Sequence, residues 1–180
     1  MEHAGPEASE RFEALFDRYH GEVAAYVRRR APARLAEDVV SETFLIAWRS
    51  LDRVHGDPLP WLYGVARRVL ANDLRREHRR SALAARLAQE PDDPPTTVLG
   101  LDVSEPVRTA LLALGHRERE AVLLIAWEGL NPKQAAAAAG CSGATFRARL
   151  YRARRHLRRA LSPRTLADEQ CGLAKEAGGS

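Results

Sequence analysis

The chain has 180 residues, of which 45% are hydrophobic and 29% charged, and its formal net charge is +4. This length suits one ordinary domain or two small ones. The N-terminus is acidic and lacks an apolar segment, and no run of 18 apolar residues follows. We therefore expect no secretory signal, no membrane-spanning helix and a cytoplasmic protein.

Arginine dominates the basic residues, with 26 arginines against 2 lysines. A guanidinium group binds phosphate and guanine in a bidentate geometry, but GC-rich coding is the simpler explanation of the overall bias. Coding bias does not explain clustering, however. The clusters at Arg28–Arg30, Arg67–Arg80 and Arg147–Arg159 predict surfaces that face a polyanion.

The two cysteines, Cys141 and Cys171, are far apart in the sequence and neither belongs to a CxxC pair. They predict neither a zinc site nor a disulfide framework. The chain also has no HExxH motif, no phosphate-binding glycine loop and no nucleophile elbow. We therefore expect no metal ion, no cofactor and no enzyme activity.

Long runs of Ala, Leu, Arg and Glu without alternating β-branched stretches predict an all-α fold. Three helices are expected in the first domain, over residues 1–80. Pro32 ends the first helix, and the stretch "HGDPLP" separates the second from the third. The expected helices are roughly Ser9–Arg30, Ala33–Val54 and Trp61–Arg80.

Residues 81–104 change in character, because the stretch "EPDDPPTT" cannot form a regular helix. We expect a flexible linker there, followed by a second small helical domain over residues 105–161. The final residues, 162–180, are expected to form a disordered tail. The helices expected in the second domain are Val107–Leu114, Arg117–Trp127, Pro132–Ala139 and Ala144–Leu161.

The face of the second helix that lies opposite its apolar stripe mixes charged residues with one leucine. Spacing of three and four residues places them together on the helix surface. This composition indicates a docking surface for a partner protein, although a solvated face with one stray leucine fits equally well. The residues are Asp38, Ser41, Glu42, Leu45 and Arg49.

The outer face of the third helix combines an aromatic residue, small residues, an amide and several guanidinium groups. Such a surface suits single-stranded nucleic acid, since aromatic rings stack on bases and arginines hold the backbone. The preceding loop, "RVHGDPLP", could form a pocket for a flipped base. For Trp61, anchoring the helix to the core is the alternative. The stripe contains Trp61, Gly64, Arg68, Ala71, Asn72, Arg75 and Arg79.

The stretch "NPKQAAAAAGCSGATFRARL" has the layout of a helix-turn-helix. Asn131 is expected to cap the first helix, with Pro132 at its first position. Gly140 is expected in the left-handed conformation that ends this helix, and Ser142 is expected to cap the second.

The second helix of this motif separates apolar from basic residues. Phe146, Leu150, Ala153, Leu157 and Leu161 share one side, and most of the arginines lie on the other. The N-terminal part of such a helix enters the major groove, so Thr145, Arg147 and Arg149 are expected nearest the bases. The alternative is a solvated basic helix on an ordinary bundle.

Five segments together resemble a known family. "AEDVVSETFLIAWRSLDRV" and "WLYGVARRVLANDLRR" are followed by the Pro/acid-rich linker, "LLALGHREREAVLLIAWEGL" and the helix-turn-helix. In this order they resemble the extracytoplasmic-function sigma factors of bacterial RNA polymerase. The resemblance covers roughly Phe12–Leu161.

The resemblance implies a transcription initiation factor with three binding surfaces, and an anti-sigma factor as a possible further partner. The first surface would dock on the clamp helices of the polymerase largest subunit, through Asp38, Ser41, Glu42, Leu45 and Arg49. The second would recognise and open the −10 promoter element, through Trp61, Tyr63, Arg68, Asn72, Arg75 and Arg79. The third would read the −35 element in duplex DNA, through Ser142, Thr145, Arg147, Arg149, Arg152 and Arg155.

The chain departs from the family pattern at Ser41, where Gln is usual, and at Arg68 and Asn72, where Asn and Asp are frequent. The expected linker is long enough for both elements: its 24 residues reach at most roughly 79 Å at about 3.3 Å each, whereas two turns of DNA span roughly 70 Å. The alternative function is a stand-alone helix-turn-helix regulator that binds duplex DNA without core polymerase.

Overall fold

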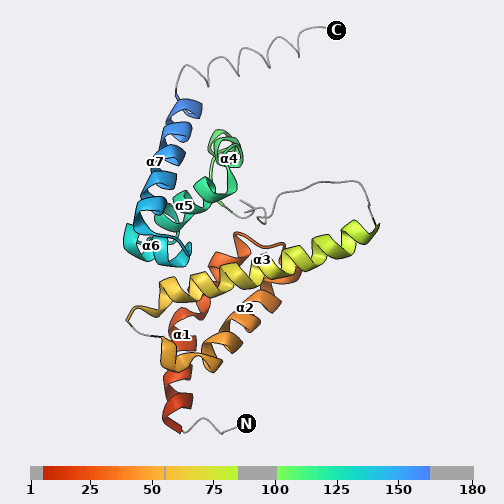
Figure 1. Ribbon diagram of the computed structural model, residues 1–180, viewed down its shortest axis with the longest axis vertical. Helices are drawn as coiled ribbons and strands as arrows, with labels where there is room; N and C mark the ends of the chain where they lie inside the picture. Colours follow the sequence, from red (N-terminus) through yellow and green to blue (C-terminus); the bar gives the residue numbers. More distant parts are fainter. Residues whose placement is uncertain (1–5, 55, 85–100, 163–180) are drawn as a thin grey trace.

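The computed structural model describes residues 6–54, 56–84 and 101–162, and in these ranges all regular structure is helical (Figure 1). The prediction of an all-α fold with two small domains is confirmed, and most predicted helix ends agree with the structure to within a few residues. The N-terminal domain contains α1 (Pro6–Arg28), α2 (Ala33–Arg49), a 3₁₀ turn (Leu51–Arg53) and α3 (Pro58–Ala84). The C-terminal domain contains α4 (Glu105–Leu112), α5 (His116–Ala126), α6 (Pro132–Ala138) and α7 (Gly143–Ala160).

In the N-terminal domain, α1, α2 and α3 each contribute an apolar stripe to one core. Val23, Val39 and Leu62 are fully buried where the three helices meet. Aromatic rings extend this core toward the start of α1, where Phe12 packs edge-on against Phe44 with ring centroids 6.5 Å apart. The outer faces of α2 and the C-terminal half of α3 stay in contact with solvent.

In the C-terminal domain, α5 and α7 pack against each other and α6 closes one end. Leu123 and Phe146 are fully buried between them. Arg119 joins α5 to the end of α4, since its guanidinium donates to the backbone oxygens of Leu111 and Leu114 at 2.8 and 2.9 Å. These bonds tie α5 to the C-terminal end of α4, where the last carbonyl groups have no partners within the helix.

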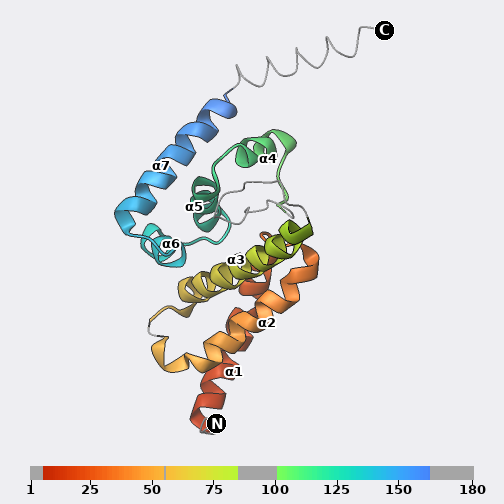
Figure 2. The ribbon, with the colours of Figure 1, turned by 45° about the vertical axis from the view of Figure 1, so that its right-hand side comes forward.

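The two domains are in direct contact, with α6 lying against α3 in both views (Figures 1 and 2). Small residues make this approach possible. A methyl group at Gly64 would lie 3.5 Å from the carbonyl oxygen of Ala138, and Ala135 and Ala138 are buried. The alanine run of the sequence therefore serves a helix–helix contact between domains.

The predicted linker is tested only at its ends. Residues 81–84 continue α3 and Leu101 is buried, so the linker is shorter than the predicted 81–104. Residues 85–100 and the predicted tail, apart from residue 162, lie outside the described ranges. Within the described chain, the helices are too short or too polar to cross a membrane.

Candidate nucleic-acid interface

The helix-turn-helix forms as its sequence predicts. The Asn131 side chain accepts from the backbone amides of Lys133 and Gln134, both at 3.0 Å, and the Gln134 side chain accepts from the Asn131 amide at 2.9 Å. This reciprocal capping box fixes the start of α6. Gly140 has φ = 62°, in the left-handed region. Ser142 caps α7 by accepting from the Thr145 amide at 3.2 Å.

The helix α7 presents a basic face to solvent and an apolar face to α5 and α6. Phe146, Leu150 and Ala153 are buried, whereas Thr145 and Arg147 are exposed. Most of the later arginines of α7 are also exposed: Arg152, Arg154, Arg155, Arg158 and Arg159. The predicted separation of faces is therefore present.

Two arginines of this basic face, Arg152 and Arg149, have neighbours on other helices that the sequence did not predict. Arg152 donates from Nε to the Glu118 carboxylate of α5 at 3.1 Å, and His156 contacts the same carboxylate at 2.9 Å. Arg149 is half-buried and lines a cavity of about 230 Å³ together with Arg67 of α3. Arg149 thus lies beside the N-terminal domain in this arrangement.

The outer stripe of α3 is exposed only along its C-terminal part. Arg68, Asn72, Arg75 and Arg79 are exposed. The Asn72 side-chain oxygen accepts from Arg75 Nη2 at 2.6 Å, which holds the two side chains together. Trp61 is half-buried and packs against the core, consistent with the anchoring role that the sequence left open.

Tyr63 does not belong to this surface. It is only 2% exposed, and its ring stacks on Tyr26 with centroids 4.5 Å apart. Burial, reinforced by the negative charge of Glu128, raises the pKa of Tyr63 well above its ordinary value. Gly64 and Ala71 of the predicted stripe are buried as well.

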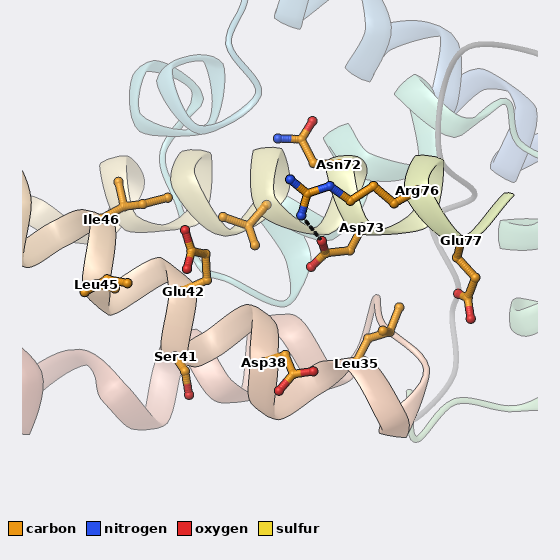
Figure 3. Close-up of a pocket in the computed structure, with 11 residues that line it drawn as sticks. Leu35, Asp38, Ser41, Glu42, Leu45, Ile46, Asn72, Asp73, Arg76 and Glu77 are labelled. Carbon is orange, nitrogen blue, oxygen red and sulfur yellow. Dashed lines mark hydrogen bonds and ion pairs between the residues drawn. The ribbon is translucent and has the colours of Figure 1, made fainter. Parts of the chain in front are cut away.

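A groove of about 810 Å³ runs between α2 and α3 (Figure 3). Four of the five predicted docking residues line it, and Leu45 is 41% exposed. Arg49 is exposed but is not among the lining residues. Figure 3 shows the Glu42 carboxylate pointing toward α3 and Arg76 paired with Asp73. The groove is lined by Leu35, Asp38, Ser41, Glu42, Leu45, Ile46, Val69, Asn72, Asp73, Arg76 and Glu77.

Sequence reasoning missed a buried charge network that joins the two domains. Arg30 is 3% exposed and donates to Glu120 at 3.0 Å and to Glu128 at 2.8 Å. The Tyr26 hydroxyl donates to Glu120 at 3.1 Å, and Arg29 pairs with Glu128. Arg29 and Arg30 therefore do not face a polyanion, and that prediction is wrong for them.

The environment of this network keeps Arg30 charged and Tyr26 neutral. Burial alone lowers the pKa of Arg30, but the neighbouring Glu120 and Glu128 outweigh it and the net pKa is raised. Burial, followed by the charge of Glu120, raises the pKa of Tyr26 well above 10. One sequence signal was available: Glu120 and Glu128 bracket the apolar run "AVLLIAW", where carboxylates close to a core usually have a partner.

No group of three or more potential metal ligands occurs in the described ranges. The described surface instead carries two stretches of exposed arginines, on α7 and on the C-terminal part of α3, and an acidic groove between α2 and α3.

Comparisons with known proteins agree with this geometry. Residues 15–80 match the family model Sigma-70 region 2, and residues 104–157 match Sigma-70, region 4. The chain is 30% identical over 166 residues to the ECF RNA polymerase sigma-E factors of Salmonella typhimurium and Escherichia coli. These matches cover 84% of this chain and 87% of each relative.

Solved structures give the same result. The sigma factor RpoE of Bartonella quintana, in complex with the anti-sigma factor NepR, superposes with a TM-score of 0.64 at 26% identity, over 84% of this chain and 97% of that one. CnrH, in complex with the cytosolic domain of CnrY, gives 0.58 at 27% identity, over 86% and 94%. With region 2 over the N-terminal domain and region 4 over the helix-turn-helix, this chain belongs to the ECF sigma factors, the non-enzymatic subunits with which bacterial RNA polymerase recognises promoters.

Proposed function

We propose that this sigma factor makes three contacts in transcription initiation, through α2, α3 and α7. The groove between α2 and α3 docks on the clamp helices of the largest subunit of core polymerase. The exposed C-terminal part of α3 captures the −10 strand as the duplex opens. The helix α7 reads the −35 element in the major groove.

The composition of the groove supports the first assignment. Asp38, Glu42, Asp73 and Glu77 line it with one arginine, Arg76, so its charge is complementary to a basic helix. Apolar lining residues, including the exposed Leu45, provide the contact area that a charged rim alone lacks. The other edge of the groove belongs to α3, so a polymerase segment docked there would lie next to the proposed −10 surface.

The positions of the exposed arginines support the other two assignments, and this observation carries the proposal most directly. Arg68, Arg75 and Arg79 project from α3 with Asn72, an arrangement that can hold a phosphate backbone while bases unstack. Thr145 and Arg147 lie in the first two turns of α7, the part of a recognition helix that reaches base edges. Ser142, Arg152 and Arg155 then contact phosphates.

An anti-sigma factor is a further partner that we propose for this chain. The two solved relatives described above are complexes, one with the anti-sigma factor NepR and the other with the cytosolic domain of CnrY. Those superpositions cover 84% and 86% of this chain, which supports a similar mode of control here.

Run-off transcription tests the proposal. Purified core polymerase plus this protein should produce defined transcripts from genomic DNA fragments, and core alone should not. A stand-alone regulator, the alternative function, would instead bind promoter duplex without core and would not start transcription. Absence of any defined start site with competent core would contradict the proposed function.

A further inference from the structure

Two basic side chains of α7, Arg152 and His156, are held by a single carboxylate of α5. Arg152 donates from Nε to Oε1 of Glu118 at 3.1 Å, and Nδ1 of His156 lies 2.9 Å from Oε2 of the same side chain. The Glu118 side chain is 15% exposed, whereas those of Arg152 and His156 are 55% and 52% exposed. A largely covered acid thus holds two basic groups at the surface of the helix-turn-helix.

The two basic groups continue a stripe of α7 that begins with residues expected nearest the DNA bases. Along this stripe, successive members are four, three and four residues apart, which places them on one side of the helix: Thr145, Arg149, Arg152 and His156. At about 1.5 Å per residue, Arg152 and His156 lie roughly 10 and 16 Å along the axis from Thr145. The major groove is about 12 Å wide, so with Thr145 in the groove this pair reaches the phosphates at its edge.

The bond to Glu118 leaves part of the Arg152 guanidinium available to a second acceptor. A guanidinium is planar and carries five N–H donors, two of which can bind one phosphate together. Glu118 accepts from Nε, and within the described ranges Nη1 and Nη2 of Arg152 have no hydrogen-bond partner. Glu118 therefore restrains the guanidinium plane while both Nη groups remain for a bidentate contact.

The same carboxylate determines how His156 can bind a phosphate. An ionised carboxylate only accepts hydrogen bonds, so Nδ1 of His156 is the donor in this contact. A neutral imidazole carries a single N–H, and its Nε2 can then only accept. A DNA phosphate also only accepts. Nε2 can therefore bind a phosphate when the ring is protonated and both nitrogens donate.

The other charged groups around His156 belong to α7 and α4. The neighbouring charged side chains on α7 are all basic: Arg152, Arg155 and Arg159. The helix α4 also packs against α7, and its two charged side chains, Glu105 and Arg108, pair with each other at 3.3 Å. Among the described residues, Glu118 is thus the one carboxylate in contact with His156, and a phosphate at Nε2 would place a second negative charge beside the ring.

We propose that Glu118 is a positioning residue for −35 recognition, which holds Arg152 and His156 as one site for a DNA phosphate, and that His156 binds this phosphate as the imidazolium. The inference rests on the proposed function, because it needs α7 in the major groove. It adds a DNA contact, His156, and the acid that supports it. Binding of the upstream duplex then takes up a proton at His156, so the affinity is higher at low pH and falls as the pH rises.

The pH dependence of promoter binding tests the inference. Holoenzyme is assembled from core polymerase and the full chain, and the duplex carries the upstream element of a start site found by run-off transcription but ends before the −10 element. Dissociation constants are measured at about pH 6 and about pH 8, between which histidine changes its charge. The pH dependence that core polymerase contributes is common to all variants. Relative to His156→Ala, wild type should gain about tenfold in affinity at the lower pH, the size of one charge-assisted hydrogen bond.

Glu118→Gln should remove the same gain for a different reason. Its amide N–H can donate to Nδ1 of His156, so the neutral ring carries its proton on Nε2 and binds phosphate at both pH values. The substitution leaves the shape of the side chain unchanged. His20→Ala, at an exposed histidine of α1, is the matched control and should keep the wild-type gain.

Salt dependence separates a phosphate contact from a purely structural role. At about pH 6, the slope of log affinity against log salt should be shallower by about one for His156→Ala than for wild type, and at about pH 8 the two slopes should agree. An unchanged slope for His156→Ala at the lower pH would overturn the inference. So would Glu118→Gln if it kept the wild-type gain or lost affinity equally at both pH values. Failure of wild-type holoenzyme to start transcription would instead refute the proposed function.

Discussion

The turn of the helix-turn-helix provides a prediction whose magnitude follows from the structure. Gly140 has φ = 62°, a conformation that costs an L-residue with a side chain about 1–2 kcal/mol. A methyl group there would also lie 2.8 Å from Arg67 Nη2. Gly140→Ala must therefore strain the turn and displace the guanidinium that contacts the Ala138 carbonyl.

Two other glycines separate these contributions. Gly129 has φ = 63° with open space around it, so Gly129→Ala should cost only the backbone strain, about 1 kcal/mol after the gain from a stiffer unfolded chain. Gly140→Ala should cost about 2 kcal/mol, because a hydrogen bond of about 0.5–1.5 kcal/mol is weakened as well. Gly21 is exposed within α1, and Gly21→Ala should stabilise by roughly 0.5–1 kcal/mol.

Denaturant unfolding followed by circular dichroism measures all three variants. The extra cost of Gly140→Ala over Gly129→Ala should disappear in an Arg67→Ala background, where no guanidinium opposes the methyl group. If Gly140→Ala left the free energy of unfolding as high as Gly21→Ala does, the left-handed conformation at Gly140 would be contradicted. If Gly140→Ala still cost more than Gly129→Ala in the Arg67→Ala background, the packing of Arg67 against this turn would be contradicted.

Three further predictions concern docking, recognition and pH. Leu45→Asp should weaken association with core polymerase about tenfold or more without changing binding to isolated −35 duplex. Leu112→Asp, at an exposed leucine of α4, should change neither. An equal loss of polymerase affinity in both variants would contradict the docking assignment. Arg149→Ala should relax base preference at one −35 position by about 1–3 kcal/mol, and a uniform loss across sequences would limit it to phosphate contact. The pKa of Tyr26 is raised in the folded chain, whereas the unfolded phenol ionises near its ordinary pKa. The contribution of Tyr26 to the free energy of unfolding should therefore stay constant below about pH 10 and decrease as the pH rises further. Tyr26→Phe should make that fall shallower, and an identical pH profile would contradict the buried hydroxyl.

Local features of the fold could be predicted from the sequence because their causes are local. Apolar spacing located the helices, and Asn131, Gly140 and Ser142 took the roles that their side chains dictate at helix ends. The separation of Phe146 and Leu150 from the arginines of α7 follows from helical periodicity alone.

Contacts between the domains could not be predicted in this way. Arg30 and Glu120 are 90 residues apart, and a helical pattern does not indicate which exposed face will meet another. Charged residues are rarely buried unless paired, so Arg30 without a visible partner was assigned to the surface. Tyr63 was also assigned to the surface because the contacts of α3 could not be foreseen. The helix α3 is covered on one side by α1 and α2 and on another by α6, so its exposed stripe is narrower than it would be in the N-terminal domain alone.

The division of work between the two domains is tested most directly by two footprints on one promoter complex. Permanganate reports unstacked thymines at the −10 element, and DNase I reports protection of the upstream duplex. With wild-type protein and core polymerase, both signals should appear. Arg75→Ala should reduce permanganate reactivity at the −10 element while upstream protection persists. Arg147→Ala should reduce upstream protection more than it reduces permanganate reactivity. If each substitution removed both signals equally, or if Arg147→Ala affected only the melted strand, the assignment of α3 and α7 to separate promoter elements would be contradicted.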